Sequence, residues 1–232
     1  MDSEDLMGRV RALHARGNNP RQIARALGVP RTKVAPLVRT ITAEEQANTP
    51  QRQIVGCWVS PGWSAGLTVH GHPDWPGLDA AESGTSGLAS LLVAREQGPG
   101  RVRVCGYLVD VYCLGLKDFL GPRAMDRHGL AAFARSYFDA YDAPPLAAPI
   151  ELAQHLVFGA VEYARNLGFE PAPGFLPAAA AHLGPWDGPS AIEFGNQGKP
   201  FFVQGPRDDP NAVMETLERS VGSDNFHYLV LV

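Results

Sequence analysis

Three side chains of metal-ligand type, His70, His72 and Asp74, lie within the five-residue segment HGHPD. Two histidines that alternate at the end of a strand point to the same side, and an aspartate beyond them could complete a metal site. The alternative is a polar loop that follows an edge strand. A catalytic zinc site has three protein ligands, each oriented by further contacts, and Pro73 restricts this loop. We favour the loop, with His70, His72 and Asp74 as the candidate ligands if a metal binds.

The same segment is similar to the H-x-H-x-D-H signature of metallo-β-lactamase-like hydrolases. That resemblance implies two metal sites, but Trp75 stands where the signature has its final histidine, which removes a ligand of the second site. The chain that precedes residue 70 is also too short to supply the early strands of that fold. We therefore expect no metal and no cofactor.

The segment CGYLVDVYCLGLKD (residues 105–118) contains a second set of candidates, Asp110, Cys113, Lys117 and Asp118. An aspartate inside an apolar strand is costly unless it is paired or functional. Lys117 could pair with Asp110 or Asp118, and Arg95 is another cation that could neutralise Asp110. Catalysis by Cys113 would need a nearby histidine to form the thiolate, and this segment offers none. We favour a structural carboxylate and a buried thiol, and an active site is the alternative.

A third segment, EFGNQGKPFFVQGP (residues 193–206), places two apolar pieces on either side of Asn196, Gln197 and Gly198. This arrangement predicts a β-hairpin. Glycines beside Lys199 are also typical of a phosphate-binding loop, but Pro200 stands where that motif requires serine or threonine. The sequence therefore gives no nucleotide-binding loop here.

A small residue, a turn glycine and apolar residues at fixed spacing near the N-terminus give the strongest functional pattern in the chain. In RQIARALGVPRTKVAPLVRTI (residues 21–41), the small Ala24 is followed four residues later by Gly28, where a turn with positive φ favours glycine. The apolar positions of this segment would bury its two helices against a preceding one: they are Ile23, Leu27, Val29, Val34 and Leu37.

This segment resembles the helix-turn-helix of bacterial site-specific recombinases and of many transcription regulators. The resemblance implies that the start of the last helix enters the major groove of DNA. The DNA contacts that it implies are Arg31, Thr32 and Lys33 at that start, Arg39 further along, and Arg21 on the preceding helix. The alternative is a helical hairpin that dimerises or docks onto another protein. Pro36 departs from the pattern, and it either kinks the last helix or ends it.

Residues 105–118 and 193–206, together with the closing Asn-Phe-His-Tyr (residues 225–228), resemble an uncharacterised bacterial family. No activity is attached to that resemblance, so it implies a domain and no mechanism.

The charge distribution separates the two parts of the 232-residue chain. Residues 1–42 contain eight Lys/Arg and three Asp/Glu, whereas the remainder contains 12 Lys/Arg and 21 Asp/Glu, which gives a net charge of −4 overall. A basic head on an acidic body fits a nucleic-acid-binding module carried by a domain with another task. We predict a helix-turn-helix domain over 1–42, a polar linker over 43–53 and a larger domain over 54–232.

The elements that position these residues alternate between helix and strand without strict βαβ order, which predicts an α+β fold. We expect helices at 3–17, 21–27, 31–41, 129–141, 149–167 and 211–221, and strands at 54–59, 65–70, 87–95, 102–113, 201–204 and 228–232.

Three cysteines without a C-x-x-C pair argue against both a disulfide framework and a structural zinc site in this chain. Because the sequence has no signal peptide and no long apolar run, we expect a cytoplasmic protein without membrane contact. We interpret the chain as a DNA-binding transcription regulator that binds duplex DNA as a homo-oligomer, whose larger domain oligomerises or senses a ligand. The alternatives are a hydrolase or nuclease-like enzyme targeted by the helix-turn-helix, and a protein-interaction adaptor.

Overall fold

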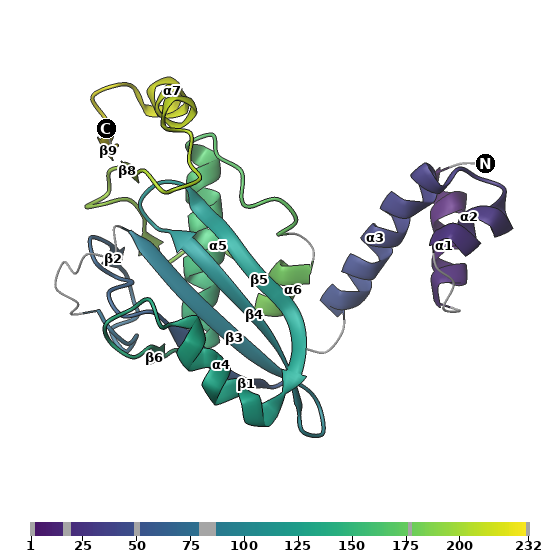
Figure 1. The fold of residues 1–232 in the computed structure, drawn as a ribbon. Helices are drawn as coiled ribbons and strands as arrows, with labels where there is room; N and C mark the ends of the chain where they lie inside the picture. The colour runs from purple at the N-terminus through teal and green to yellow at the C-terminus, as the bar shows by residue number, and fades with distance from the viewer. Residues whose placement is uncertain (1–2, 16–19, 49–51, 79–86, 176–177, 231–232) are drawn as a thin grey trace. The chain divides into compact units, whose positions relative to one another are not determined.

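Three helices followed by an antiparallel sheet with its own helices give the chain an α+β architecture, the class that the sequence predicts (Figure 1). The computed structural model describes residues 3–15, 20–48, 52–78, 87–175 and 178–230. Two compact units make up the chain, Met1–Gln51 and Arg52–Val232. Within the described residues, no helix is both long and apolar enough to cross a membrane.

The first unit consists of α1 (Ser3–Ala15), α2 (Pro20–Leu27) and α3 (Arg31–Asn48). Its core contains one apolar stripe from each helix, because apolar residues recur at helical spacing and face inward. The fully or nearly buried members are Val10, Ile23, Ala24, Val34, Val38 and Ile41.

The third helix is longer than the sequence predicts. It continues through Ile41 to Asn48, so the first six residues of the expected linker 43–53 are helical. Alanine, glutamate and glutamine dominate this stretch and are good helix formers, so helix can extend without an apolar stripe. Pro36 lies inside α3 and does not end it.

A five-stranded antiparallel sheet forms the centre of the second unit, in the order β5–β4–β3–β1–β6. Its strands are β1 (Ile54–Val59), β3 (Leu88–Gly98), β4 (Arg101–Asp110), β5 (Gly115–Asp126) and β6 (Leu146–Ala147). The strands predicted at 87–95 and 102–113 correspond to β3 and β4, which form an antiparallel hairpin with a register that runs from Leu88 opposite Asp110 to Gly98 opposite Arg101.

Helices cover both faces of this sheet. On one face, α5 (Ile150–Asn166) and α6 (Ala178–Leu183) pack against the larger core, and α4 (Leu130–Tyr137) packs against the smaller core on the other. Strand β3 contributes Leu91 and Val93 to the first core and Leu92 and Ala94 to the second. Burial on both faces explains why this strand is a continuous apolar run.

The C-terminal segment adds a small module at one end of the sheet. Helix α7 (Pro210–Val221) packs against Phe202 of β8 (Phe201–Val203), and β8 forms a two-stranded parallel sheet with β9 (His227–Leu229). Another two-stranded sheet joins β2 (Thr68–Val69) to β7 (Ile192–Glu193).

The hairpin predicted at 193–206 is wrong. The turn itself is present, since Gln197 and Gly198 have φ values of 53° and 79° and Asn196 forms a bridge with Lys199. Its two flanks pair elsewhere, however, β7 with β2 and β8 with β9. The sequence pattern therefore predicted the turn correctly, but the two segments that flank it pair with other strands and not with each other.

Candidate nucleic-acid interface

The connection between α2 and α3 is a tight turn centred on Gly28. Gly28 has a φ of 65°, the left-handed conformation predicted for it. The Val29 N–H donates to the Ala24 carbonyl at 3.1 Å, which is the long-range bond of a Schellman motif. Val29 is also partly buried against the core of this unit. This turn ends α2 and directs the chain into α3 within three residues.

The predicted DNA contacts lie on the outside of the first unit. Arg21 is exposed at the start of α2, and Arg31, Thr32 and Lys33 are exposed in the first turn of α3. Val34 and Val38 on the opposite side of α3 are buried, so helical periodicity explains why the polar residues face solvent. Arg39 belongs to α3, but its side chain lies outside the described residues.

The start of α3 carries positive side chains, whereas the N-terminus of a helix usually favours negative ones. The first turn of a helix carries unpaired N–H groups and partial positive charge, which favour acidic side chains. Helix α3 has no acidic residue in its first turn and has Arg31 and Lys33 there instead. An anion bound at this end would relieve that repulsion, and a DNA phosphate is such an anion.

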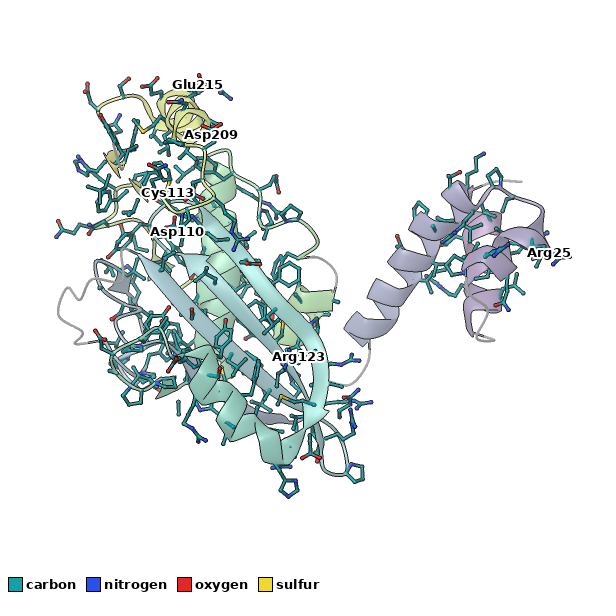
Figure 2. All side chains as sticks on the ribbon, in the orientation of Figure 1. Arg25, Asp110, Cys113, Arg123, Asp209 and Glu215 are labelled. Carbon is teal, nitrogen blue, oxygen red and sulfur yellow. The ribbon has the colours of Figure 1, made fainter. Side chains whose placement is uncertain are left out.

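Arg25 is a further candidate that sequence reasoning missed. It is exposed on α2 four residues after Arg21, and Figure 2 shows it projecting outward from the first unit. The i, i+4 spacing places both arginines on one side of α2, so the signal was available in the sequence.

The candidate metal ligands do not converge. His70 approaches Glu193 at 3.8 Å between Nε2 and Oε2, whereas the His72 ring stacks on Trp75 with centroids 4.2 Å apart. Asp74 is exposed. Among the residues that the structure describes, no group of three or more His, Cys, Asp or Glu side chains could hold a metal ion.

A histidine distant in sequence lies beside this segment. The ring of His155, on α5, is 5.5 Å from that of His72 between centroids, and its Nδ1 accepts the Ala191 N–H at 2.8 Å. Burial and, to a smaller extent, His72 lower the pKa of His155. An acceptor Nδ1 and a lowered pKa both favour the neutral ring, which suits a structural hydrogen bond.

Asp110 is a buried structural carboxylate at the end of β4, where Figure 2 places it beside Cys113. Its Oδ1 accepts the N–H groups of Tyr112 at 3.0 Å and Cys113 at 2.9 Å, so it closes the turn into β5. Burial raises its pKa to about 6. Burial also raises the pKa of the Cys113 thiol, which opposes formation of a nucleophilic thiolate.

Lys117 and Asp118 pair with a distant loop and not with Asp110. The Lys117 Nζ contacts Asp208 Oδ2 at 2.5 Å, and Asp118 Oδ2 lies 3.6 Å from Arg207 Nη2. Arg95 is buried near the other end of the β3–β4 hairpin and also has other partners. The hydrogen bonds and ion pairs of these candidates therefore involve separate partners. Lys117 nevertheless lies near enough to Asp110 and Cys113 to oppose the rise in the pKa of both groups.

The chain matches no family model, no curated protein and no solved structure in comparisons with known proteins.

Proposed function

We propose that this chain binds duplex DNA through the first turn of α3 and acts as a transcription regulator in the cytoplasm. Its second unit would oligomerise or sense a ligand. The observation that carries the proposal is the cationic first turn of α3, with Arg31, Thr32 and Lys33 exposed directly after the Gly28 turn.

The chemistry of these side chains suits a groove of DNA. Arginine can form two hydrogen bonds with guanine, whereas lysine acts as a point charge toward phosphate or base. The opposite side of α3 is anchored in the core of the first unit by Val34 and Val38. The helix can therefore present its polar side as a fixed surface.

Single substitutions in the full chain test this proposal. Arg31→Ala and Lys33→Ala should each weaken duplex binding, and the arginine change should also relax sequence preference, by about 1–3 kcal/mol if Arg31 reads a base. Fluorescence anisotropy with a labelled duplex, selected from a random pool by the wild type, gives both quantities. Arg219→Ala, an exposed arginine on α7, is the matched control. Equal affinities for wild type and Arg31→Ala/Lys33→Ala would contradict the proposal.

A further inference from the structure

The acidic balance of the second unit hides a strongly basic end. Six of its twelve Lys and Arg residues lie around the turn that joins β3 to β4. Five of the six are exposed, and we call them the arginine end: Arg52, Arg101, Arg103, Arg123 and Arg127. Figure 2 shows Arg123 at the opposite end of the sheet from Asp110.

Backbone contacts hold the arginine end around that turn. Arg52 donates from Nη1 to the Gln97 carbonyl at 2.5 Å, and the Arg127 N–H donates to the Gly100 carbonyl at 2.9 Å. Strand register adds Arg101 opposite Asp126, and Arg123 opposite Val104. Segments from three parts of the sequence thus bring arginines to the same end of the sheet. Arg123 faces the side covered by α4, with its guanidinium 4.7 Å from the centroid of the Phe133 ring, whereas Arg101 and Arg103 face the other side.

The sixth arginine, Arg95, adds to the repulsion between like charges around this turn. It lies directly opposite Arg103 on the neighbouring strand, and like charges in this position destabilise a sheet. Arg95 is buried and donates to the carbonyls of Arg52, His182 and Leu183. It therefore adds a sixth positive charge to this end of the sheet.

Acidic side chains offset only part of this charge. Among the described residues, the carboxylates on the elements that carry the arginine end near the turn are Glu96 and Asp126. Glu96 Oε1 lies 3.9 Å from Arg127 Nη1. Asp126 accepts the backbone N–H of His128 at 2.7 Å and also contacts its ring, so it is partly engaged already. This end of the sheet thus carries two such carboxylates and five exposed arginines.

We propose that the arginine end binds the phosphate backbone of duplex DNA, which rests on the proposed function and adds contacts that carry no sequence information. Guanidinium groups match phosphate oxygens through paired hydrogen bonds, and phosphate contacts supply much of the affinity of DNA-binding proteins. Arg52 is the first residue of the second unit, so the chain that comes from α3 enters this unit at its basic end.

The salt dependence of duplex binding by the full chain tests this inference. Each phosphate contact contributes about 0.9 to the slope of log affinity against log salt concentration. The double substitution Arg101→Ala/Arg103→Ala should therefore reduce that slope by about 2. It should weaken binding to a selected duplex and to a scrambled one by the same factor.

Two further variants make the result decisive. Arg101→Lys/Arg103→Lys keeps both charges and should keep most of the wild-type slope, which separates charge from folding. Arg165→Ala/Arg219→Ala removes two exposed arginines of α5 and α7, and should leave the slope unchanged. If the wild type binds duplex and Arg31→Ala weakens binding, an unchanged slope in Arg101→Ala/Arg103→Ala overturns this inference alone. If the wild type shows no duplex binding, the proposed function fails with it.

Discussion

Asp110 illustrates how a buried charge can be structural without an ion-pair partner in contact. Its carboxylate accepts two backbone N–H groups of the turn that follows β4, and those groups would otherwise be buried without partners. Lys117, which the sequence suggested as its neutralising cation, contacts Asp208 instead. Position 110 therefore requires a short side chain with an oxygen that can accept these hydrogen bonds.

The raised pKa of Asp110 predicts an unusual pH dependence. With a pKa of about 6 in the folded protein, against an ordinary value near 3.8, the folded state binds this proton more tightly. Asp110 therefore contributes most to stability below pH 4, and this contribution is lost as the pH rises through 6. The unfolding free energy of wild type minus that of Asp110→Asn should fall by about 2 kcal/mol from pH 4 to pH 7. Urea titrations across this range measure the difference, and a constant difference would contradict the burial argument.

Gly28 should be intolerant because of its backbone conformation and not because of crowding. A Cβ built at this position meets nothing within 4 Å, but a φ of 65° costs most residues about 1–2 kcal/mol, and β-branched residues more. Gly28→Val should destabilise the first unit and abolish DNA binding, whereas Gly28→Asn should be milder.

The control for this prediction is Gly8→Ala, since Gly8 lies within α1 with open space around its Cβ position. Alanine should stabilise that helix by about 1 kcal/mol. Circular dichroism and anisotropy give the two readouts. Wild-type DNA affinity in Gly28→Val would show that the turn does not position α3 for binding.

The predictability of each element from sequence depended on where its stabilising contacts lie. Apolar runs and a glycine-rich turn between them identified β3 and β4, and helical spacing identified α5, because these signals are local. Strand β5 was missed, since its outer half is exposed and contains Gly121 and Pro122 among charged residues. It is a strand because it pairs with β4, and local propensity does not encode that pairing.

The candidate site divides in the same way. The exposure of Arg31 and Lys33 follows from helical periodicity around Val34, so the sequence was sufficient to predict it. Lys117 and Asp208, by contrast, are 91 residues apart, and the arginine end joins three separate segments. Contacts of this kind depend on the register between strands and on which distant segments pack together. A single sequence contains no local signal for either.

The loop before α7 should depend on one carboxylate that is mostly, but not fully, buried. Asp208 Oδ2 accepts the Gly205 N–H at 2.7 Å and contacts Lys117, and its side chain is 12% exposed. Asp208→Ala should lower the unfolding free energy by about 3 kcal/mol, because it leaves the Lys117 charge largely buried without its partner.

The neighbouring Arg207 provides the control for Asp208. Its ion pair with Asp118 spans 3.6 Å, and its side chain is 89% exposed. Exposed pairs contribute little, so Arg207→Ala should change stability by less than about 1 kcal/mol. Denaturant titration of both variants tests the contrast, and equal effects would show that burial does not set the strength of these pairs.

Across the whole molecule, the two units differ in what their charges can do. The first presents cations on exposed helix starts, and the second is acidic overall with arginines concentrated around one turn. Electrostatic attraction to DNA would therefore act at two defined surfaces, and the remaining acidic surface of the second unit would repel phosphate.

The three cysteines of the second unit are free and buried, so none of them exposes a thiol to solvent.

A single helix of this size makes few phosphate contacts, so we expect the full chain to bind DNA as a homodimer. Dimeric helix-turn-helix proteins contact half-sites about 10 base pairs apart, one helical turn, on the same side of the duplex. A duplex with two selected half-sites at that spacing should bind at least about tenfold more tightly than a duplex with one, since the second contact is intramolecular. Shifting one half-site by five base pairs rotates it to the opposite side and should remove the gain. Sedimentation velocity with each duplex measures stoichiometry and affinity together, and one chain bound to the paired site with no gain would contradict the dimer.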